Sequence, residues 1–463
     1  MSRVQGRGPQ RDAKQAEQEA AAQARMAEVY REIMLRAPEH DLVPSLDRIA
    51  EVCRLLGDPQ KAYEVVHVTG TNGKTSTTRM IERLLREHGL RTGRFTSPHL
   101  NDVRERITID GDLLPREQFI STYEEVLPYV EIVDAASARD GGPRMTFFEL
   151  LVAMAFAAFA DNPVDVAAIE VGMGGSWDAT NVADGRVAVV TPVAIDHERF
   201  LGHTVGEIAT EKAGIIKPGA TAVLAEQHPD ALDPLLRRAA EVGASVLREG
   251  YEFGVLGREV ALGGQLLTLR GRENPYEEIY LPLHGAHQAR NAAAALAAVE
   301  AFLGADRLSI DVVRAAFEDV TSPGRLEVVR RGPTVLVDAA HNPAGAAVLA
   351  DGLEEAFGFS KLIGLVAVLA DKDADGILGA LEPVLAEVVI SRTSSPRSMD
   401  VDELAEIAID VFGEDRVHVR ERLDDALDFA IGLAEAGGEL GGGVLCTGSV
   451  TMAADIRTLL RIA

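Results

Sequence analysis

The sequence predicts an α/β fold in two parts. The N-terminal domain has a mostly parallel, doubly wound sheet plus a small antiparallel β region, and a C-terminal Rossmann-like α/β domain follows. From residue 62 onward, buried strand patterns alternate with helical ones, which is typical of parallel sheets covered by helices on both faces. Between residues 250 and 283 short runs separated by glycines replace this alternation and indicate antiparallel strands. A second strand–helix series begins near residue 322.

Length and composition bound the class of protein. The chain has 463 residues, of which 47% are apolar, so it is long enough for two or three domains with their own cores. The formal net charge of -26 argues against a general binder of nucleic acid or anionic membranes. No apolar run approaches the roughly 20 residues that span a bilayer. Cys53 and Cys446 lie far apart and form no CxxC, which favours a reducing cytoplasm.

The first domain is expected over residues 25–321, after a flexible polar tail at residues 1–24, and the second over residues 322–463. Helical spacing comes first, at residues 26–37 and 46–56. Further helices are predicted at 75–89, with Gly89 as its cap, at 146–160, in the second half of 221–243, and at 287–304. Strands are predicted within residues 62–70, 91–100, 164–175, 186–197, 221–226, 258–264, 265–271, 334–338, 361–368, 387–393 and 441–447.

A glycine-rich loop, "GTNGKT", lies between the buried run at 62–70 and the helix at 75–89. The usual phosphate-binding loop reads G-x-x-x-x-G-K-[ST], which would place a Gly at position 68, where this chain has Val68. The strand before it and the helix after it are still the context of such a loop, because backbone N–H groups at a helix start attract phosphates. An ordinary glycine turn with an incidental Lys74 is the alternative.

Two predicted strands end in groups that bind metal ions. Glu170 ends the apolar run "VDVAAIE", and Asp196-His197 ends "VAVVTPVAIDH". Ligands of doubly wound sheets bind at the carboxyl ends of the strands, and a carboxylate there needs a cation or hydrogen bonds. Glu170 could instead serve as a helix cap or ion-pair acid, and His197 as a structural histidine.

Six segments together resemble a known family: "GTNGKTST", "FTSPHL", "EVGMGGSWDATN", "AIDH", "EKAGIIKPG" and "VDAAHNP". They resemble the Mur-ligase-like ATP-dependent amide ligases and, within them, folylpolyglutamate synthase/dihydrofolate synthase. The resemblance runs from about residue 25 to the C-terminus, with the motifs in the expected order. The short loop G-x-x-G-K-[ST] is this superfamily's own spelling, so Val68 is no defect in an N-terminal P-loop ATPase domain.

The resemblance implies a role for each matched residue. Lys74, Lys212 and His341 would be catalytic, with His341 near the transferred phosphate or the incoming glutamate and Lys212 matching a lysine that is carbamylated in relatives. The nucleotide would be bound by Gly70, Thr71, Asn72, Gly73, Lys74, Thr75, Asn291, Arg325 and Asp338. Mg²⁺ would be held by Ser97, Glu170, His197 and Thr75. The pteroate part of the substrate would be bound by Thr146, Phe147, Phe148, Glu149, Trp177, Asp178 and Ala179.

Plainer readings stay open for several of these residues. Phe147 and Phe148 fit a helix core, and Lys212 fits a solvated helix face. Arg325 fits a linker, and His341 precedes a Pro that suits a helix start. One residue departs from the family pattern: Ser176 stands where the family often has Arg, which puts details of the pterin site in doubt.

The resemblance implies glutamate addition to folates, and to dihydropteroate, through an acyl phosphate. ATP, two Mg²⁺ ions and a monovalent cation are the expected cofactors. Dihydropteroate, reduced folates and L-glutamate are the expected partners of a cytoplasmic monomer that binds neither nucleic acid nor membrane. Two alternatives are a cell-wall UDP-sugar-peptide ligase and a P-loop regulatory ATPase without ligase activity. Only 69 residues precede Gly70, which argues against the N-terminal UDP-binding domain of the former.

Overall fold

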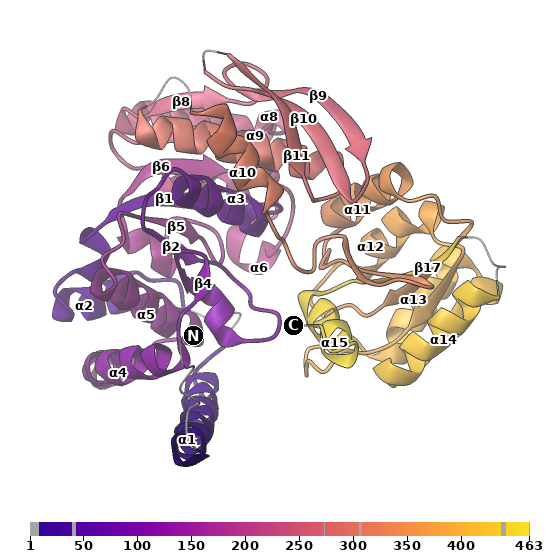
Figure 1. Cartoon of the computed structure of the whole chain (residues 1–463), viewed down its shortest axis with the longest axis horizontal. Coiled ribbons are helices and arrows are strands. Elements are labelled where there is room, and N and C mark those ends of the chain that lie inside the picture. Colours follow the sequence, from indigo (N-terminus) through magenta and orange to yellow (C-terminus); the bar gives the residue numbers. More distant parts are fainter. Residues whose placement is uncertain (1–8, 39–42, 273, 305–307, 437–440, 463) are drawn as a thin grey trace, which may run out of the picture.

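The computed structural model describes residues 9–38, 43–272, 274–304, 308–436 and 441–462. Figure 1 shows two α/β bodies side by side, with helix α1 (Pro9–Met34) running out from the first. The first body contains an eight-stranded and a three-stranded sheet, and the second a six-stranded sheet. The predicted fold class is therefore confirmed.

The eight-stranded sheet has the order β4-β3-β2-β5-β1-β6-β7-β8. All pairs from β2 to β8 are parallel, and β3 and β4 add an antiparallel edge. Strand β1 is buried along almost its whole length, as expected for a parallel strand covered on both faces. The strands are β1 (Glu64–Thr69), β2 (Thr92–Phe95), β3 (Ile107–Ile109), β4 (Asp112–Leu113), β5 (Val166–Glu170), β6 (Gly185–Val190), β7 (Thr221–Leu224) and β8 (Ser245–Arg248).

Alternate side chains of the central strands pack into different cores. Val65 and Ile169 lie in one core, whereas Val66 and Val68 lie in another on the opposite face. The first core is covered by α1, α2 (Asp47–Leu55), α4 (Arg116–Arg139) and α5 (Phe147–Asp161), and the second by α3 (Lys74–Glu87), α9 (Ala286–Leu303) and α10 (Ile310–Glu318). Beyond β6, α7 (Val205–Lys212) and α8 (Pro229–Val242) cover β7, after the short α6 (Glu198–Leu201). Helix α5 is buried nearly all round, as its sequence predicts.

The small antiparallel region is a meander with the order β11-β10-β9, whose strands are β9 (Gly254–Ala261), β10 (Gly264–Arg270) and β11 (Pro275–Leu281). It packs against α9 and α10 and shares their core. The glycine-separated runs at 250–283 thus form the predicted strands.

The second body has the sheet order β12-β13-β17-β14-β15-β16, in which only β12 is antiparallel. Helices α11, α12 and α13 cover one face, and α14 and α15 cover the other. The strands are β12 (Glu327–Arg330), β13 (Thr334–Val337), β14 (Lys361–Val366), β15 (Glu387–Ile390), β16 (Val417–Val419) and β17 (Gly442–Thr447); the helices are α11 (Pro343–Ala356), α12 (Ala374–Leu381), α13 (Val401–Phe412), α14 (Leu423–Glu435) and α15 (Val450–Leu459).

The start of the first helix corrects one expectation. Helix α1 begins at Pro9, so the predicted flexible tail is wrong for residues 9–24, and residues 1–8 lie outside the described residues. The segment is polar, but its Ala, Gln and Glu residues favour helix. The boundary at residue 322 stays a prediction and falls between α10 and β12. Across the described ranges, no helix has both the length and the apolar character that a membrane crossing requires.

A buried ion pair ties the end of α1 to the segment before α5. The Arg36 guanidinium donates to Asp134 at 2.9 Å and to the carbonyl of Met145 at 3.0 Å, and both charged side chains are largely buried. Asp134 also accepts the Met145 N–H at 2.7 Å. The pair therefore holds two chain segments that are distant in sequence against α4.

We expect Asp134→Ala to lower the free energy of unfolding by about 3–5 kcal/mol, because it leaves a buried guanidinium unpaired. Urea denaturation followed by circular dichroism measures this loss. Arg144→Ala is the matched control, since Arg144 reaches the same carboxylate at 3.3 Å but has 68% of its side chain exposed. Equal losses in the two variants would contradict the role of the buried pair.

Candidate active site

A cavity of about 1060 Å³ lies where the two bodies meet. It is lined by residues that follow the carboxyl ends of β1, β2, β5 and β6 in the first body, and of β13, β14 and β15 in the second. Parallel sheets bind ligands at this edge, where loops and helix starts expose unpaired backbone groups. The cavity is therefore the candidate active site.

The glycine loop between β1 and α3 depends on two glycines. Gly70 has φ +147° and Gly73 has φ +86°. A Cβ on Gly70 would lie 1.8 Å from the Thr191 hydroxyl oxygen, and one on Gly73 would lie 2.7 Å from the Asn291 side-chain oxygen. Helix α3 begins directly afterwards at Lys74. The predicted strand–loop–helix context is confirmed, with the positive end of α3 facing the cavity.

Two lysines converge on this loop. The Lys74 ammonium donates to the carbonyls of Gly70 and Thr71 at 3.1 and 3.0 Å. The Lys212 ammonium donates to the Gly70 carbonyl at 2.8 Å and is buried, so a solvated position for Lys212 is wrong. Burial lowers the pKa of Lys74, while Glu170 and Asp196 act against that shift. Burial, and then the charge of Lys74, lowers the pKa of Lys212 to about 7.

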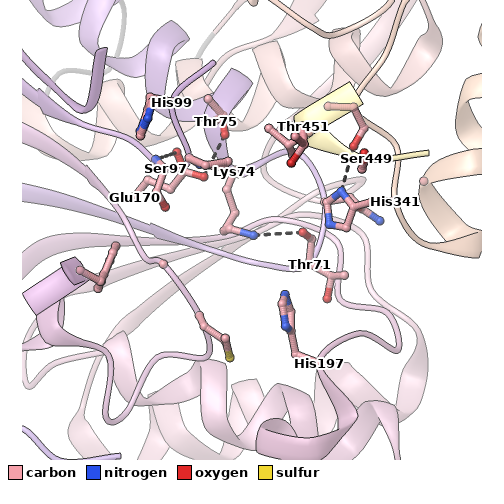
Figure 2. Close-up of a pocket in the computed structure, with 18 of the residues that line it drawn as sticks. Thr71, Lys74, Thr75, Ser97, His99, Glu170, His197, His341, Ser449 and Thr451 are labelled. Atoms are coloured by element: carbon pink, nitrogen blue, oxygen red, sulfur yellow. Dashed lines mark hydrogen bonds between the residues drawn. The ribbon is translucent and has the colours of Figure 1, made fainter. Parts of the chain in front are cut away.

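Thr75, Ser97 and Glu170 meet beside Lys74. The Thr75 hydroxyl donates to one carboxylate oxygen of Glu170 at 2.9 Å, and the Ser97 backbone N–H donates to the other at 3.2 Å. Figure 2 shows these three residues together, with His197 lying apart from them. Burial raises the pKa of Glu170, and the charge of Lys74 and the two hydrogen bonds act against that shift. Glu170 therefore ends its strand as a buried acid and caps no helix.

This oxygen cluster fits a magnesium ion. Mg²⁺ prefers one or two carboxylates, hydroxyl oxygens and substrate phosphates as ligands, and Glu170 is 1% exposed with its charge only partly balanced. His197 sits at the C-terminal side of the same sheet edge, with φ +52°. Burial lowers the pKa of His197 to about 3, so its ring is neutral near pH 7 and retains a lone pair.

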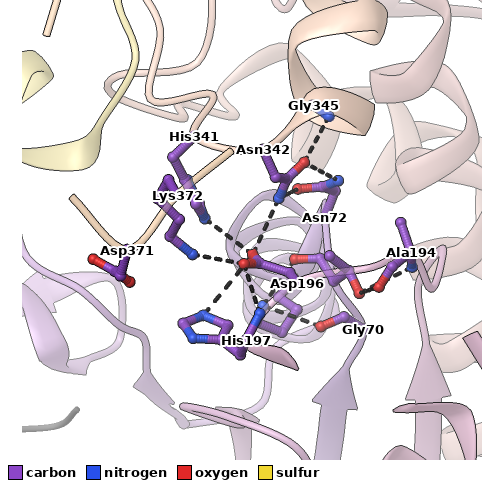
Figure 3. A network of polar contacts seen from close by, with 12 residues as sticks. Gly70, Asn72, Ala194, Asp196, His197, His341, Asn342, Gly345, Asp371 and Lys372 are labelled. Carbon is purple, nitrogen blue, oxygen red and sulfur yellow. Dashed lines mark hydrogen bonds and ion pairs between the residues drawn. The ribbon is translucent and has the colours of Figure 1, made fainter. Parts of the chain in front are cut away.

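Asp196 links the two bodies (Figure 3). Its carboxylate accepts from the Lys372 ammonium at 2.6 Å and from the Asn342 amide at 3.1 Å, and lies 3.5 Å from the His341 Nε2. Burial would raise the pKa of Asp196, but the hydrogen bond from His341 and the charge of Lys372 outweigh it and hold that pKa far below its usual range. The amides of Asn342 and Asn72 also bond to each other at 3.2 Å, which joins the second body to the glycine loop.

His341 has an acceptor at each ring nitrogen. Its Nδ1 lies 2.8 Å from the Ala339 carbonyl oxygen, while Nε2 faces Asp196. An imidazole that points both nitrogens at acceptors is poorly placed to take a proton from an amine. In the described arrangement, His341 therefore lines the cavity as a hydrogen-bond donor. Asn342 caps α11, so the helix start predicted from Pro343 is confirmed beside it.

Asp338 and Arg325 lie on the same wall of the cavity. Asp338 is buried and accepts the N–H groups of Leu326 and Ala340 at 2.7 and 2.8 Å. Burial raises the pKa of Asp338, and the charge of Arg325 acts against that rise. Arg325 and Asn291 both line the cavity, Asn291 from α9 beside Gly73. The structure thus brings together all the residues predicted to bind the nucleotide.

The segment predicted to bind the pteroate part forms the start of α5. Thr146 caps this helix by accepting the Glu149 N–H, and Glu149 accepts the Thr146 N–H in return. Arg48 donates to Glu149 at 3.0 Å. Phe147 lies 4.9 Å below the Arg106 guanidinium, and Phe148 packs against Phe95, with ring centroids 5.7 Å apart. Both phenylalanines are core residues that also line the cavity.

Trp177, Asp178 and Ala179 also line the cavity. Asp178 is buried and caps η3 (Ala179–Val182) by accepting the Thr180 N–H at 3.0 Å. Burial raises the pKa of Asp178 to about 6, although hydrogen bonds oppose the rise. Ser176 turns to the Glu211 carbonyl at 3.0 Å and packs against Gly214, where a Cβ would lie 2.2 Å from its hydroxyl oxygen.

Several cavity residues were missed by sequence reasoning. Lys372 follows β14 as Asp338 follows β13, so the rule applied to Glu170 would have identified it. Tyr30 reaches the cavity from α1, and its hydroxyl lies 3.5 Å from His99 Nε2. No spacing in the sequence indicates that Tyr30 contacts a loop 69 positions away.

Comparisons with known proteins agree with this geometry. Residues 140–299 match the family described as Mur ligase middle domain, and residues 324–450 match Mur ligase, glutamate ligase domain. The chain is thus an ATP-dependent ligase of the Mur ligase type. It is 52% identical over 445 residues to the dihydrofolate synthase/folylpolyglutamate synthase of Mycobacterium tuberculosis, covering 92% of this chain and 91% of the relative. The chain belongs to the dihydrofolate synthase/folylpolyglutamate synthase family.

Other relatives and solved structures agree. The Bacillus subtilis dihydrofolate synthase/folylpolyglutamate synthase is 34% identical over 426 residues, which cover 90% of this chain and 95% of that protein. The M. tuberculosis folylpolyglutamate synthase complexed with ADP has a TM-score of 0.91 at 50% identity, over 95% of this chain and 99% of the other. Escherichia coli FolC in complex with DHPP and ADP has a TM-score of 0.78 at 29% identity, over 91% and 94%. A regulatory ATPase without ligase activity is not supported.

We expect Lys74→Ala to abolish turnover, because it removes the cation that the glycine loop holds at the start of α3. ADP release measures this loss. Lys61→Ala is the control, since Lys61 is 63% exposed and pairs only with Asp58 among the described residues. Robust activity in Lys74→Ala would remove the loop from the chemistry.

We expect Asp196→Asn to lower kcat about tenfold, because Lys372 loses a buried carboxylate partner and the contact between the two bodies weakens. Steady-state kinetics with varied glutamate measures the effect. Asp371→Asn, one residue from Lys372 and half-exposed, is the matched control. Identical kinetics in the two variants would contradict a role for the inter-body contact.

Proposed function

We propose that the chain uses ATP to join the amine of L-glutamate to a carboxylate of folate compounds, and that it also glutamylates dihydropteroate. One observation carries the proposal: a phosphate-type loop, a buried acid beside it and an aromatic wall line one cavity together with basic groups of a second domain. The near full-length similarity to proteins with both activities in their names supports the bifunctional form. The cell-wall branch shares the Mur ligase domains, but it is a more distant relative.

The glycine loop is the proposed site of the ATP phosphates. The N–H groups of Gly70–Thr75 and the start of α3 supply donors, and Lys74 supplies a positive charge. Asn291, Arg325 and Asp338 would contact the nucleotide from α9 and the second body. The neighbours solved with ADP or AMPPCP support the binding of an adenine nucleotide.

Thr75, Ser97 and Glu170 would hold Mg²⁺, and His197 would join them or hold a second ion. Bound Mg²⁺ neutralises phosphate charge during phosphoryl transfer. A monovalent cation is part of the same proposal. Carbamylation of Lys212 is also part of the proposal. An amine with a pKa of about 7 is substantially uncharged at neutral pH, and carbamylation requires the uncharged form.

The proposed chemistry passes through an acyl phosphate. The substrate carboxylate attacks the γ-phosphorus, ADP leaves, and the neutral amine of glutamate then attacks the acyl carbon and displaces phosphate. Lys74 and Arg325 would neutralise the phosphates, while Lys372 and His341 would present positive or donor groups from the second body. The contact through Asp196 would hold the two bodies closed and exclude water.

The wall formed by Phe147, Phe148 and Trp177 is the proposed site of the pteroate rings. Flat aromatic side chains suit flat heterocycles, and Thr146, Glu149, Asp178 and Ala179 would provide the adjoining polar contacts. The E. coli neighbour solved in complex with DHPP and ADP supports the binding of two small-molecule ligands. We further infer a cytoplasmic monomer that binds no nucleic acid, consistent with two free buried cysteines and a net charge of -26.

The deciding experiment measures ADP release by the purified protein with ATP, Mg²⁺, glutamate and either dihydropteroate or a reduced folate. We expect turnover that requires both glutamate and the pterin substrate, and its loss when EDTA removes the metal. ADP release that is independent of glutamate would contradict the proposal. Turnover with reduced folate alone would confine the protein to polyglutamylation.

A further inference from the structure

A fully buried histidine lies behind the cavity wall. His67 is 0% exposed in the middle of β1, three residues before Gly70, and it neither lines the cavity nor enters the mechanism above. It occupies the same face of β1 as Val65, toward η3. A buried histidine in a parallel strand costs free energy unless its ring has a partner.

The ring has one partner among the described residues. His67 Nε2 lies 2.9 Å from the Thr180 hydroxyl oxygen, whereas Nδ1 is buried with no partner in the described structure. The Thr180 hydroxyl itself donates to a carboxylate oxygen of Asp178. The Thr180 hydroxyl has one proton and donates it to Asp178, so it must accept a hydrogen bond from His67. His67 is therefore the neutral tautomer with its proton on Nε2.

This chain of hydrogen bonds ends at the cavity. Asp178 lines the cavity, and its second carboxylate oxygen accepts a hydrogen bond from the Met173 N–H at 2.9 Å. Both carboxylate oxygens are thus held by hydrogen bonds, one from Met173 and one from Thr180. Thr180 is 0% exposed, so neither Thr180 nor His67 can touch a substrate there.

We propose that His67 is a positioning residue for the pterin substrate: through Thr180 it fixes the orientation of the Asp178 carboxylate. This inference rests on the proposed function only in taking Asp178 as a contact of the pterin substrate. Because His67 belongs to the strand that leads into the glycine loop, the same strand orients both the Asp178 carboxylate and the phosphate loop. Burial lowers the pKa of His67 to about 3, which keeps the donor uncharged at working pH.

Thr180→Val tests the chain, because it removes the hydroxyl and keeps the shape. We expect the KM for dihydropteroate to rise about tenfold, the usual effect of losing a hydrogen bond to a charged group, while the KM for ATP stays within about twofold. Thr180→Ser keeps the hydroxyl and should stay close to the wild type. Thr108→Val is the matched control, since Thr108 is 1% exposed in the same sheet and its hydroxyl has no partner among the described residues.

Variants of His67 complete the cycle. His67→Leu should raise the KM for dihydropteroate as Thr180→Val does, and His67→Gln, which keeps an N–H donor, should recover most of it. The double variant His67→Leu/Thr180→Val should be no worse than Thr180→Val alone, because His67 acts through Thr180. Additive losses, parallel rises in both KM values, or an equal effect of Thr108→Val would overturn the inference.

A measurement without turnover separates this inference from the proposed function. ¹⁵N imidazole shifts of the wild-type protein should show His67 as the neutral Nε2–H tautomer, and Thr180→Val should change its Nε2 shift. A different tautomer, or a shift unaffected by Thr180→Val, would overturn the inference. Lack of glutamate-dependent turnover in the wild type would instead overturn the proposed function and leave the hydrogen-bond chain standing.

Discussion

Two parallel sheets point their carboxyl ends at one cavity, and this constraint places nearly every polar group of the site. Parallel strands expose their last carbonyls and the following loops at the same edge, and each loop leads into a helix whose first N–H groups are unpaired. The ends of β1, β5, β13 and β14 therefore deliver the phosphate loop, Glu170, Asp338 and Lys372 to the cavity, and the loop after β6 places Asp196 against Lys372. Each body supplies only part of this set.

Burial of charge is the price of that convergence. Lys74, Lys212, Glu170 and Asp196 are all largely buried, and each is stabilised by a partner of opposite charge or by hydrogen bonds. Asp196 is the clearest case, because Lys372 and Asn342, which bond to its carboxylate, belong to the other body. The site is thus electrostatically complete only when the two bodies lie together, which suits a reaction that needs water excluded.

The local pattern of the sequence predicted most of the fold and much of the site. Strand–helix alternation predicted both main sheets, and glycine-separated runs predicted the antiparallel one. The rule that ligands bind at strand ends pointed to Glu170 and to the loop at Gly70–Thr75, and the structure places Glu170 and most of this loop in the cavity lining. The polar composition of the first residues did not predict helix α1, although their Ala, Gln and Glu residues favour helix. The strand-end rule also covers Lys372, which sequence reasoning did not identify.

The sequence by itself determined the element order, the short phosphate loop and the residue types available to the chemistry, because these depend on periodicity and spacing along the chain. Only the tertiary structure decided that Lys212 is buried against Gly70, that Asp196 meets Lys372 and His341, and that His67 reaches Asp178 through Thr180. Those contacts join residues up to 176 positions apart. Strand register and the approach of the two bodies set them, and neither leaves a periodic trace in the sequence.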